Sequence, residues 1–202
     1  FTVDDNQGGA FQASYDAGVA LEQGLQMRVD GRSYNGLLKF VRATTDGREL
    51  RSGPVVLSKL ISTRRFYIPN ASGFVRAFDT LENPTASPIT VTMQHFGRFG
   101  SYYQSVISVL ITAPAATTLR YAIHGSPPGP IAGGVPGTVG YIFAGSGGAT
   151  PDATNFTTRD FSWSWTVTVP ANSSVAYVNY LSLRTSTLTA DVQTQATGLW
   201  TP

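Results

Sequence analysis

The residues from Phe161 to Val169 alternate strictly between two kinds of side chain. Every odd position carries Phe, Trp or Val, and every even position carries Ser or Thr. Successive side chains of an extended strand point to opposite faces, so this pattern predicts a β-strand with one buried and one solvated face. The range 88–96 repeats the pattern, with Ile89, Val91 and Met93 on one side. The period of two therefore favours sheet structure over helix.

Other segments rich in β-branched and aromatic residues are separated by turn-forming residues, which is typical of an all-β chain. The dipeptides Asp30-Gly31, Asn35-Gly36 and Asp46-Gly47 tolerate the positive φ that tight hairpins need. About eleven strands in one chain predict a large antiparallel β-sandwich, Ig-like or jelly-roll-like. The further strands are expected at 11–15, 25–29, 37–44, 55–68, 74–81, 102–112, 119–123, 139–143 and 175–183.

Two segments depart from the strand pattern. Leu188, Val192, Ala196 and Leu199 recur at helical spacing, which predicts one short helix over 187–199. In the range 125–151, 14 of 27 residues are Gly or Pro, yet a short strand in its middle suggests an elaborated crossover. We therefore expect residues 1–202 to form a single sandwich domain, with a split near residue 130 as the alternative.

The charge distribution argues against nucleic acid as a partner. The chain carries 14 basic and 12 acidic residues, a net charge of +2, and its arginines are spread along the whole length. A nucleic-acid-binding protein concentrates cations on one face, and the adjacent pair Arg64-Arg65 is only a weak cluster. No apolar run is long enough for a membrane-spanning helix, so we also expect no membrane insertion.

Cysteine is absent, which excludes disulfides, thiol catalysis and Cys-based zinc sites. The chain is also rich in Ser and Thr, poor in Lys and Glu, and begins at Phe1. These features favour an exported segment. We expect an extracellular or cell-surface location.

Two short motifs carry a resemblance to a known family. The run 83–93, Asn-Pro-Thr-Ala-Ser-Pro-Ile-Thr-Val-Thr-Met, and the run 167–175, Val-Thr-Val-Pro-Ala-Asn-Ser-Ser-Val, each join a turn to a Val/Thr strand. They resemble bacterial secreted Ig-like sandwich modules such as the CARDB-type adhesion modules, although Gly commonly stands where this chain has Asn172. The resemblance implies a non-catalytic surface or adhesion role and carries over no functional residue.

The sequence gives little support to catalysis. Neither His95 nor His124 has a second histidine at metal-binding spacing, and His95 shares the apolar face of its predicted strand. Ser101, His124 and Asp79 form a possible triad only by folding. Asp4 and Asp5 offer hard oxygen ligands for a structural Ca²⁺ ion, but no calcium-loop motif accompanies them. We expect no enzyme activity and no cofactor other than this possible Ca²⁺.

The aromatic residues divide into a predicted core and a predicted binding loop. Trp163 and Trp165 lie on the apolar face of the strand over 161–169, which favours the core. Gly97 and Gly100 indicate a loop, and loops carry function on sandwiches. That loop offers aromatic rings and one cation for stacking against a ligand. The candidate ligand-binding residues are Phe96, Arg98, Phe99, Tyr102 and Tyr103.

Three functions remain open at this stage. The first is a structural, adhesive or self-assembling surface module, whose partners are like subunits or neighbouring domains and whose N-terminal segment 7–16 could add a strand to a neighbour. The second is a carbohydrate-binding domain that holds glycans with the 96–103 loop. The third is a viral jelly-roll coat subunit.

Overall fold

The computed structural model describes residues 2–4, 10–15, 18–34, 48–69, 73–99, 108–110, 121–125, 138–144, 148–157 and 159–184. These residues form two seven-stranded sheets, and every strand pairing in them is antiparallel. The described part contains no helix. In it, no helix is long and apolar enough to cross a membrane.

Sheet A has the strand order β1-β2-β3-β8-β13-β12, with β4 beside β3. Its strands are β1 (Thr2–Asp4), β2 (Ala10–Tyr15), β3 (Gly18–Val29), β4 (Arg32–Ser33), β8 (Ile89–Phe99), β12 (Ala153–Phe156) and β13 (Asp160–Val169). Sheet B has the order β5-β6-β7-β14-β11-β10-β9. Its strands are β5 (Glu49–Leu57), β6 (Leu60–Tyr67), β7 (Phe74–Asn83), β9 (Ser108–Leu110), β10 (Tyr121–Gly125), β11 (Thr138–Ile142) and β14 (Ser173–Arg184).

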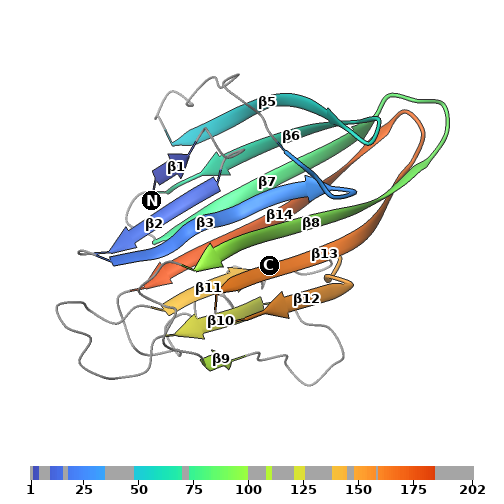
Figure 1. Cartoon of the computed structure of the whole chain (residues 1–202). Coiled ribbons are helices and arrows are strands. Elements are labelled where there is room, and N and C mark those ends of the chain that lie inside the picture. The colour runs from blue at the N-terminus through green and yellow to red at the C-terminus, as the bar shows by residue number, and fades with distance from the viewer. Residues whose placement is uncertain are drawn as a thin grey trace.

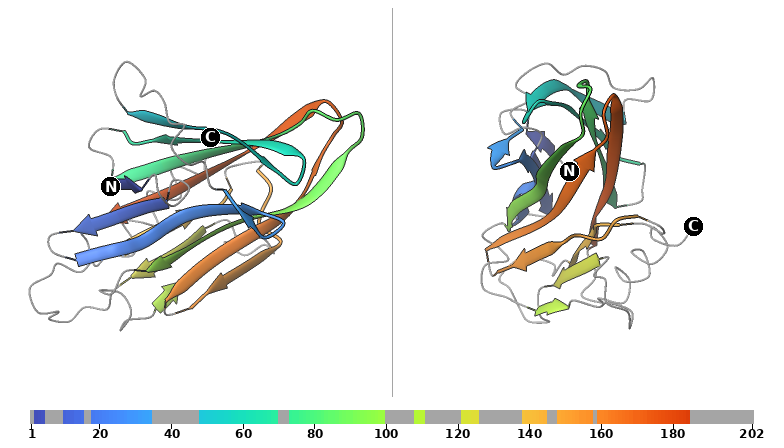
Figure 2. Two further views of the ribbon diagram at one scale, coloured as in Figure 1. Left: turned by 45° about the horizontal axis from the view of Figure 1, so that its top comes forward. Right: turned by 90° about the vertical axis from the view of Figure 1, so that its right-hand side faces the viewer.

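The predicted β-sandwich is confirmed: the two sheets pack face to face in Figures 1 and 2. The described residues alone supply 14 strands, against about nine in a variable-type Ig domain and about eight in a jelly roll. The sandwich is therefore larger than either of the two expected forms. The helix expected over 187–199 and the strand expected over 37–44 lie outside the described residues.

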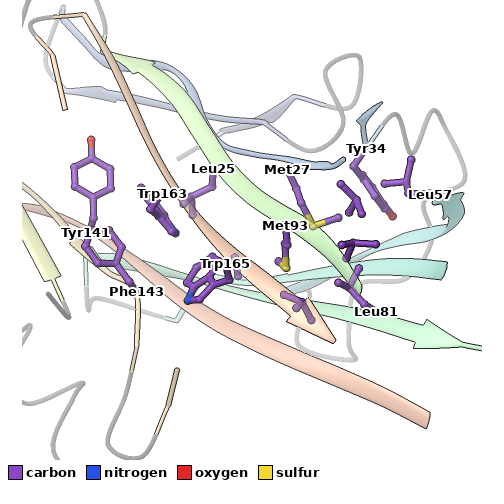
Figure 3. Packing of buried hydrophobic residues seen from close by; sticks show 14 of the residues in the cluster. Leu25, Met27, Tyr34, Leu57, Leu81, Met93, Tyr141, Phe143, Trp163 and Trp165 are labelled. Carbon is purple, nitrogen blue, oxygen red and sulfur yellow. The ribbon is translucent and has the colours of Figure 1, made fainter. Parts of the chain in front are cut away.

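The core lies between the sheets and is rich in aromatic side chains, as Figure 3 shows. Trp163 and Trp165 of β13 are only 1% and 2% exposed, which confirms their predicted place in the core. The Trp163 ring packs against Phe143, with ring centroids 4.6 Å apart, and Trp165 packs against Tyr177 of β14 at 4.9 Å. Burial of such large apolar surfaces is the main source of stability.

Two connections at one end carry the chain from sheet to sheet, at the right of Figure 1. One joins β7 to β8 and the other joins β13 to β14. Because β7 pairs with β14 and β8 pairs with β13, the strands that these connections join form the longest ladder in each sheet. The buried Asn83 side chain links them, donating from Nδ2 to the carbonyl oxygens of Val169 (3.0 Å) and Pro170 (3.1 Å).

Three expectations are wrong in detail. The single strand expected over 55–68 is a hairpin, because Ser58 and Lys59 adopt positive φ values of 49° and 69° and reverse the chain. In the loop expected at 96–103, residues 96–99 instead form the end of β8, where Gly97 is buried and pairs with Phe161, and residues 100–103 lie outside the described residues. The residues of β2, expected to be available to a neighbour, already pair with β1 and β3.

Other expectations agree with the described strands. The Asp30-Gly31 turn is confirmed, with both residues at positive φ, 48° and 76°. The short strand expected inside the Gly/Pro-rich segment is confirmed as β11. It pairs with β10, so strands on either side of residue 130 belong to the same sheet.

Candidate functional site

The outer face of sheet B gathers arginines and aromatic rings on three neighbouring strands. On β6 and β7 the side chains of Arg64, Phe66, Ala77 and Asp79 are buried between the sheets. Alternation along each strand therefore turns the intervening side chains outward. We call this surface the arginine–aromatic face. Its residues are Glu49 and Arg51 on β5, Thr63, Arg65 and Tyr67 on β6, and Arg76, Phe78 and Thr80 on β7.

Two cross-strand pairs on this face stack a guanidinium on a ring. Arg65 is paired directly with Phe78, and its guanidinium carbon lies 4.2 Å from the ring centroid. Arg76 is paired directly with Tyr67 at 4.9 Å. Cation–π contacts of this kind hold the guanidinium planes in fixed orientations while leaving their edges accessible to other groups.

Two hollows open on the arginine–aromatic face and share Arg65. The larger has a volume of about 460 Å³ and the smaller about 140 Å³. Arg64 also borders the larger hollow, but its side chain is fully buried. The larger hollow is lined by Arg51, Ser52, Gly53, Pro54, Thr63, Arg64, Arg65 and Thr80, and the smaller by Glu49, Arg65, Tyr67, Arg76 and Phe78.

A β-bulge shapes the rim of the larger hollow. The register between β5 and β6 shifts between Ser52 and Val55, at Gly53-Pro54. The buried Tyr34 side chain fixes this bulge from within the core, because its hydroxyl donates to the Gly53 carbonyl at 2.6 Å and lies 2.9 Å from Ser52 Oγ. Burial raises the pKa of Tyr34, so this hydroxyl keeps its proton. Bulges next to a site commonly aim backbone and side chains toward a ligand.

One carboxylate balances part of the positive charge on this face. Glu49 Oε1 accepts from Arg51 Nε at 3.1 Å and lies 3.8 Å from Arg65 Nη1. The Arg51 side chain is 57% exposed and that of Arg65 is 37% exposed. A guanidinium carries five N–H donors, so one shared carboxylate oxygen leaves most of the donor capacity of both arginines for a ligand.

A second cluster of ionisable side chains lies inside the sandwich. Asp79 of β7 accepts a hydrogen bond from Arg64 Nε through Oδ1, at 2.6 Å. Its other oxygen, Oδ2, lies 2.6 Å from Nε2 of His95 on β8. All three side chains are 0% exposed. The His95 ring also lies 5.6 Å from Trp165 and 5.8 Å from Trp163, centroid to centroid.

The protonation states in this cluster follow from burial and pairing. Burial alone raises the pKa of Asp79, but the Arg64 guanidinium and the His95 hydrogen bond outweigh it and hold the pKa below its ordinary value. Burial lowers the pKa of His95 more strongly than its bond to Asp79 raises it. At neutral pH the aspartate is charged and the histidine is neutral, so His95 donates from Nε2.

This cluster holds the sheets together, and its chemical groups are out of reach of a substrate. Among the described residues no hydrogen-bond partner reaches His95 Nδ1. The packed histidine expected from the sequence is confirmed. Asp79, considered with Ser101 and His124 in a triad, instead pairs with Arg64 and His95, while Ser101 lies outside the described residues.

The structure separates the site residues predicted from the sequence. Phe96 and Arg98 extend from β8 on sheet A, on the opposite side of the sandwich from the arginine–aromatic face. The Arg28 guanidinium lies 4.8 Å from the Phe96 ring centroid, and Arg98 Nε is 3.4 Å from Asp160 Oδ1. Phe99 ends β8, and its side chain lies outside the described residues, as do Tyr102 and Tyr103. A joint role for these five residues stays a prediction.

The possible calcium site also stays a prediction. Asp4 belongs to β1, whereas Asp5 lies outside the described residues. Within the described part of the chain, no three His, Asp or Glu side chains gather into a group that could hold a metal ion.

Sequence reasoning missed the arginine–aromatic face. Its signal is the i, i+2 recurrence of outward arginines and rings, Arg65 with Tyr67 and Arg76 with Phe78. Neither strand shows that these two pairs become neighbours, because only the register between β6 and β7 brings them together.

Comparison with known proteins identifies the fold. No family model matches the chain, and no curated protein matches it. Solved structures do: a heparan sulfate lyase mutant from Pedobacter heparinus has a TM-score of 0.53 at 7% identity, covering 90% of this chain and 28% of that one. This chain thus spans about a quarter of the length of the lyase.

Two bacterial proteins of closer length share the same arrangement, each named as a "putative aldose 1-epimerase". The one from Klebsiella pneumoniae has a TM-score of 0.53 at 9% identity, covering 98% of this chain and 80% of that one. The one from Escherichia coli K12 has a TM-score of 0.51 at 8% identity, covering 90% and 94%. At these identities the likeness shows the fold alone, and the CARDB-type resemblance stays a prediction. The chain is a large two-sheet antiparallel β-sandwich whose fold is similar to that of these solved structures.

Proposed function

We propose that this chain is a non-catalytic, extracellular sandwich module that binds saccharides on the arginine–aromatic face. The observation that carries the proposal is the hollow of about 460 Å³ between β5, β6 and β7. Hollows of about 300–1,000 Å³ are typical of small-ligand sites. Guanidinium and threonine hydroxyl groups line this one, and a hydroxyl-rich ligand can exchange hydrogen bonds with both.

The names of the structural neighbours lend further support. The names of the heparan sulfate lyase and of the two putative aldose 1-epimerases each refer to a saccharide substrate. The non-catalytic part of the proposal draws on the burial of His95 and Asp79, which removes the strongest acid–base pair in the described residues from contact with a substrate.

Self-assembly through sheet edges receives less support from the described strands. At one edge of sheet A, β12 has only four residues. At one edge of sheet B, β5 contains Pro54 and a bulge. Short strands, proline and bulges all oppose edge-to-edge pairing.

A substitution that fills the larger hollow tests the proposed function. Thr80→Trp places a large side chain in the hollow without changing charge, and the matched control Thr92→Trp places the same ring on the outer face of sheet A. We expect the unaltered chain and Thr92→Trp to be retained on an array of immobilised polysaccharides. Thr80→Trp should bind at least about tenfold more weakly, because the ligand space is filled.

The melting temperatures of both variants serve as the folding control. Tryptophan is well accepted on a half-buried strand surface, so we expect both to stay close to the unaltered chain. Equal retention of the two variants would place binding elsewhere, and no retention of the unaltered chain on any polysaccharide would refute the proposed function.

A further inference from the structure

The arginine–aromatic face places two like charges side by side, and one carboxylate balances them only in part. Arg51 of β5 and Arg65 of β6 are directly opposite each other in the register of the two strands. Like charges at such cross-strand positions repel, because their Cβ atoms lie only about 4.5–5.5 Å apart. Both side chains also line the larger hollow. Glu49 relieves this repulsion only in part, because its Oε1 bonds Arg51 at 3.1 Å but lies 3.8 Å from Arg65 Nη1. An anionic ligand group in the hollow would relieve the rest.

The charge balance of the two hollows points the same way. Apart from the buried Arg64, which is paired with Asp79, their charged residues are Arg51, Arg65 and Arg76 against Glu49 alone. Three positive charges and one negative charge leave an excess of two.

The rings on this face favour an ionic ligand group over stacked sugar or base rings. Phe78 and Tyr67 each have a guanidinium over one ring face, at 4.2 and 4.9 Å. Their stacking surface is therefore already used in part. The stacked guanidiniums, in contrast, are oriented in advance for two-point recognition of a carboxylate or a sulfate.

We infer that the saccharide bound by this face is acidic, and that its carboxylate or sulfate group is held between Arg51 and Arg65 in the larger hollow. This inference rests on the proposed function and names its substrate class. Arg76 supplies a second cationic position in the smaller hollow, one strand away. The ligand is thus an oligosaccharide with repeated negative charges, which can contact both positions.

The test compares charged and neutral saccharides by calorimetric titration of the full chain. The carboxylate pair is oligogalacturonate and its methyl ester, and the sulfate pair is dextran sulfate and dextran of equal length. We expect at least one charged member to bind tenfold or more tightly than its neutral partner. Arg65→Gln should weaken that binding about tenfold to a hundredfold, and Arg65→Lys should restore little of it, because lysine lacks the planar fork.

A stability measurement checks the same arrangement without a ligand. Arg51→Gln removes the repulsion across the strands together with the exposed Arg51–Glu49 ion pair, and such exposed pairs contribute little to stability. At low salt the melting temperature of the ligand-free protein should therefore not fall, while binding of the charged saccharide should weaken. The control Arg159→Gln alters an exposed arginine that directly precedes β13 of the other sheet, and should change neither property.

The outcomes separate the two proposals. If neutral and charged saccharides bind equally well, the acidic ligand is refuted while the saccharide function stands. If no saccharide of either kind binds, both are refuted. If a single-stranded oligonucleotide of equal charge binds as tightly and Arg65→Lys behaves like the unaltered chain, the face is a general polyanion surface and the inference is overturned.

Discussion

At the scale of single residues, Arg64 and Arg65 show how alternation gives sequence neighbours opposite roles. Arg64 is buried in an ion pair with Asp79, whereas Arg65 lines both outer hollows. They are adjacent in the sequence, but they form no basic cluster because a strand directs successive side chains to opposite faces. The buried pair could not be predicted, because Leu60, Ser62 and Arg64 together form no apolar stripe.

The buried histidine predicts a specific pH dependence of stability. In the unfolded chain His95 has an ordinary pKa of 6.5, while burial lowers its pKa in the folded protein. As the pH falls through 6.5, the unfolded state therefore binds a proton that the folded state does not, and folding stability is lost. We expect the free energy of unfolding, measured with urea at pH 7.5 and 5.5, to decrease by up to about 1.4 kcal/mol per pH unit from this residue.

The variant His95→Gln isolates this contribution. Its amide can still donate to Asp79 but does not titrate, so the loss between the two pH values should be smaller than in the unaltered chain. Asp79, whose folded pKa is lowered, adds a separate loss only as the pH falls below its ordinary value of 3.8. An identical pH dependence in the two proteins would contradict these assignments.

At the scale of elements, the pattern of alternation located most strands, and its failures have local causes. The register of β8 continues through Phe99 because Gly97 occupies a buried position opposite Phe161, where the sequence suggested only a flexible loop. The β5–β6 hairpin was missed because its turn residues, Ser58 and Lys59, are not the ones that favour positive φ.

The same turn offers a stabilising substitution. Non-glycine residues in the left-handed region cost about 1 kcal/mol each, and Asn-Gly is the dipeptide best suited to two consecutive positive φ angles. We expect the double variant Ser58→Asn with Lys59→Gly to raise the free energy of urea unfolding by about 1 kcal/mol. Asp30→Asn, at a turn that already has a suitable Asp-Gly pair, should change it by less than about 0.5 kcal/mol. A loss of stability in the double variant would show that the turn is not under strain.

At the scale of the whole molecule, the sequence predicts the sandwich but not its strand order. The class follows from composition and alternation, which are local properties. The order depends on contacts such as that between Asn83 and Val169, which are 86 positions apart. The arginine–aromatic face could not be predicted as a site for a similar reason. Which residues belong to it depends on which strands become neighbours and in which register.

The Asn83 side chain joins the two connections between the sheets. Its Nδ2 donates to three carbonyl oxygens, those of Ser87, Val169 and Pro170, at 2.8, 3.0 and 3.1 Å. Asn83→Asp replaces this donor with a carboxylate oxygen that faces the same acceptors. We expect a loss of at least about 3 kcal/mol in the free energy of unfolding.

The control for this substitution is Asn155→Asp on the exposed strand β12. It makes the same chemical change where water can solvate the new charge, and should cost less than about 0.5 kcal/mol. Equal effects of the two substitutions, measured by urea unfolding, would show that Asn83 does not join the two connections.

The pairing of β7 with β14 and of β8 with β13 has a consequence for how the chain reaches its native state. Neither sheet has its longest ladder until the range 160–184 meets the range 74–99. During synthesis, the earlier range therefore leaves the ribosome with its core-facing side chains exposed and must wait for the later one. The two halves of the core then form in a single late event, and this interval is when the nascent chain is most exposed to aggregation and most dependent on chaperones.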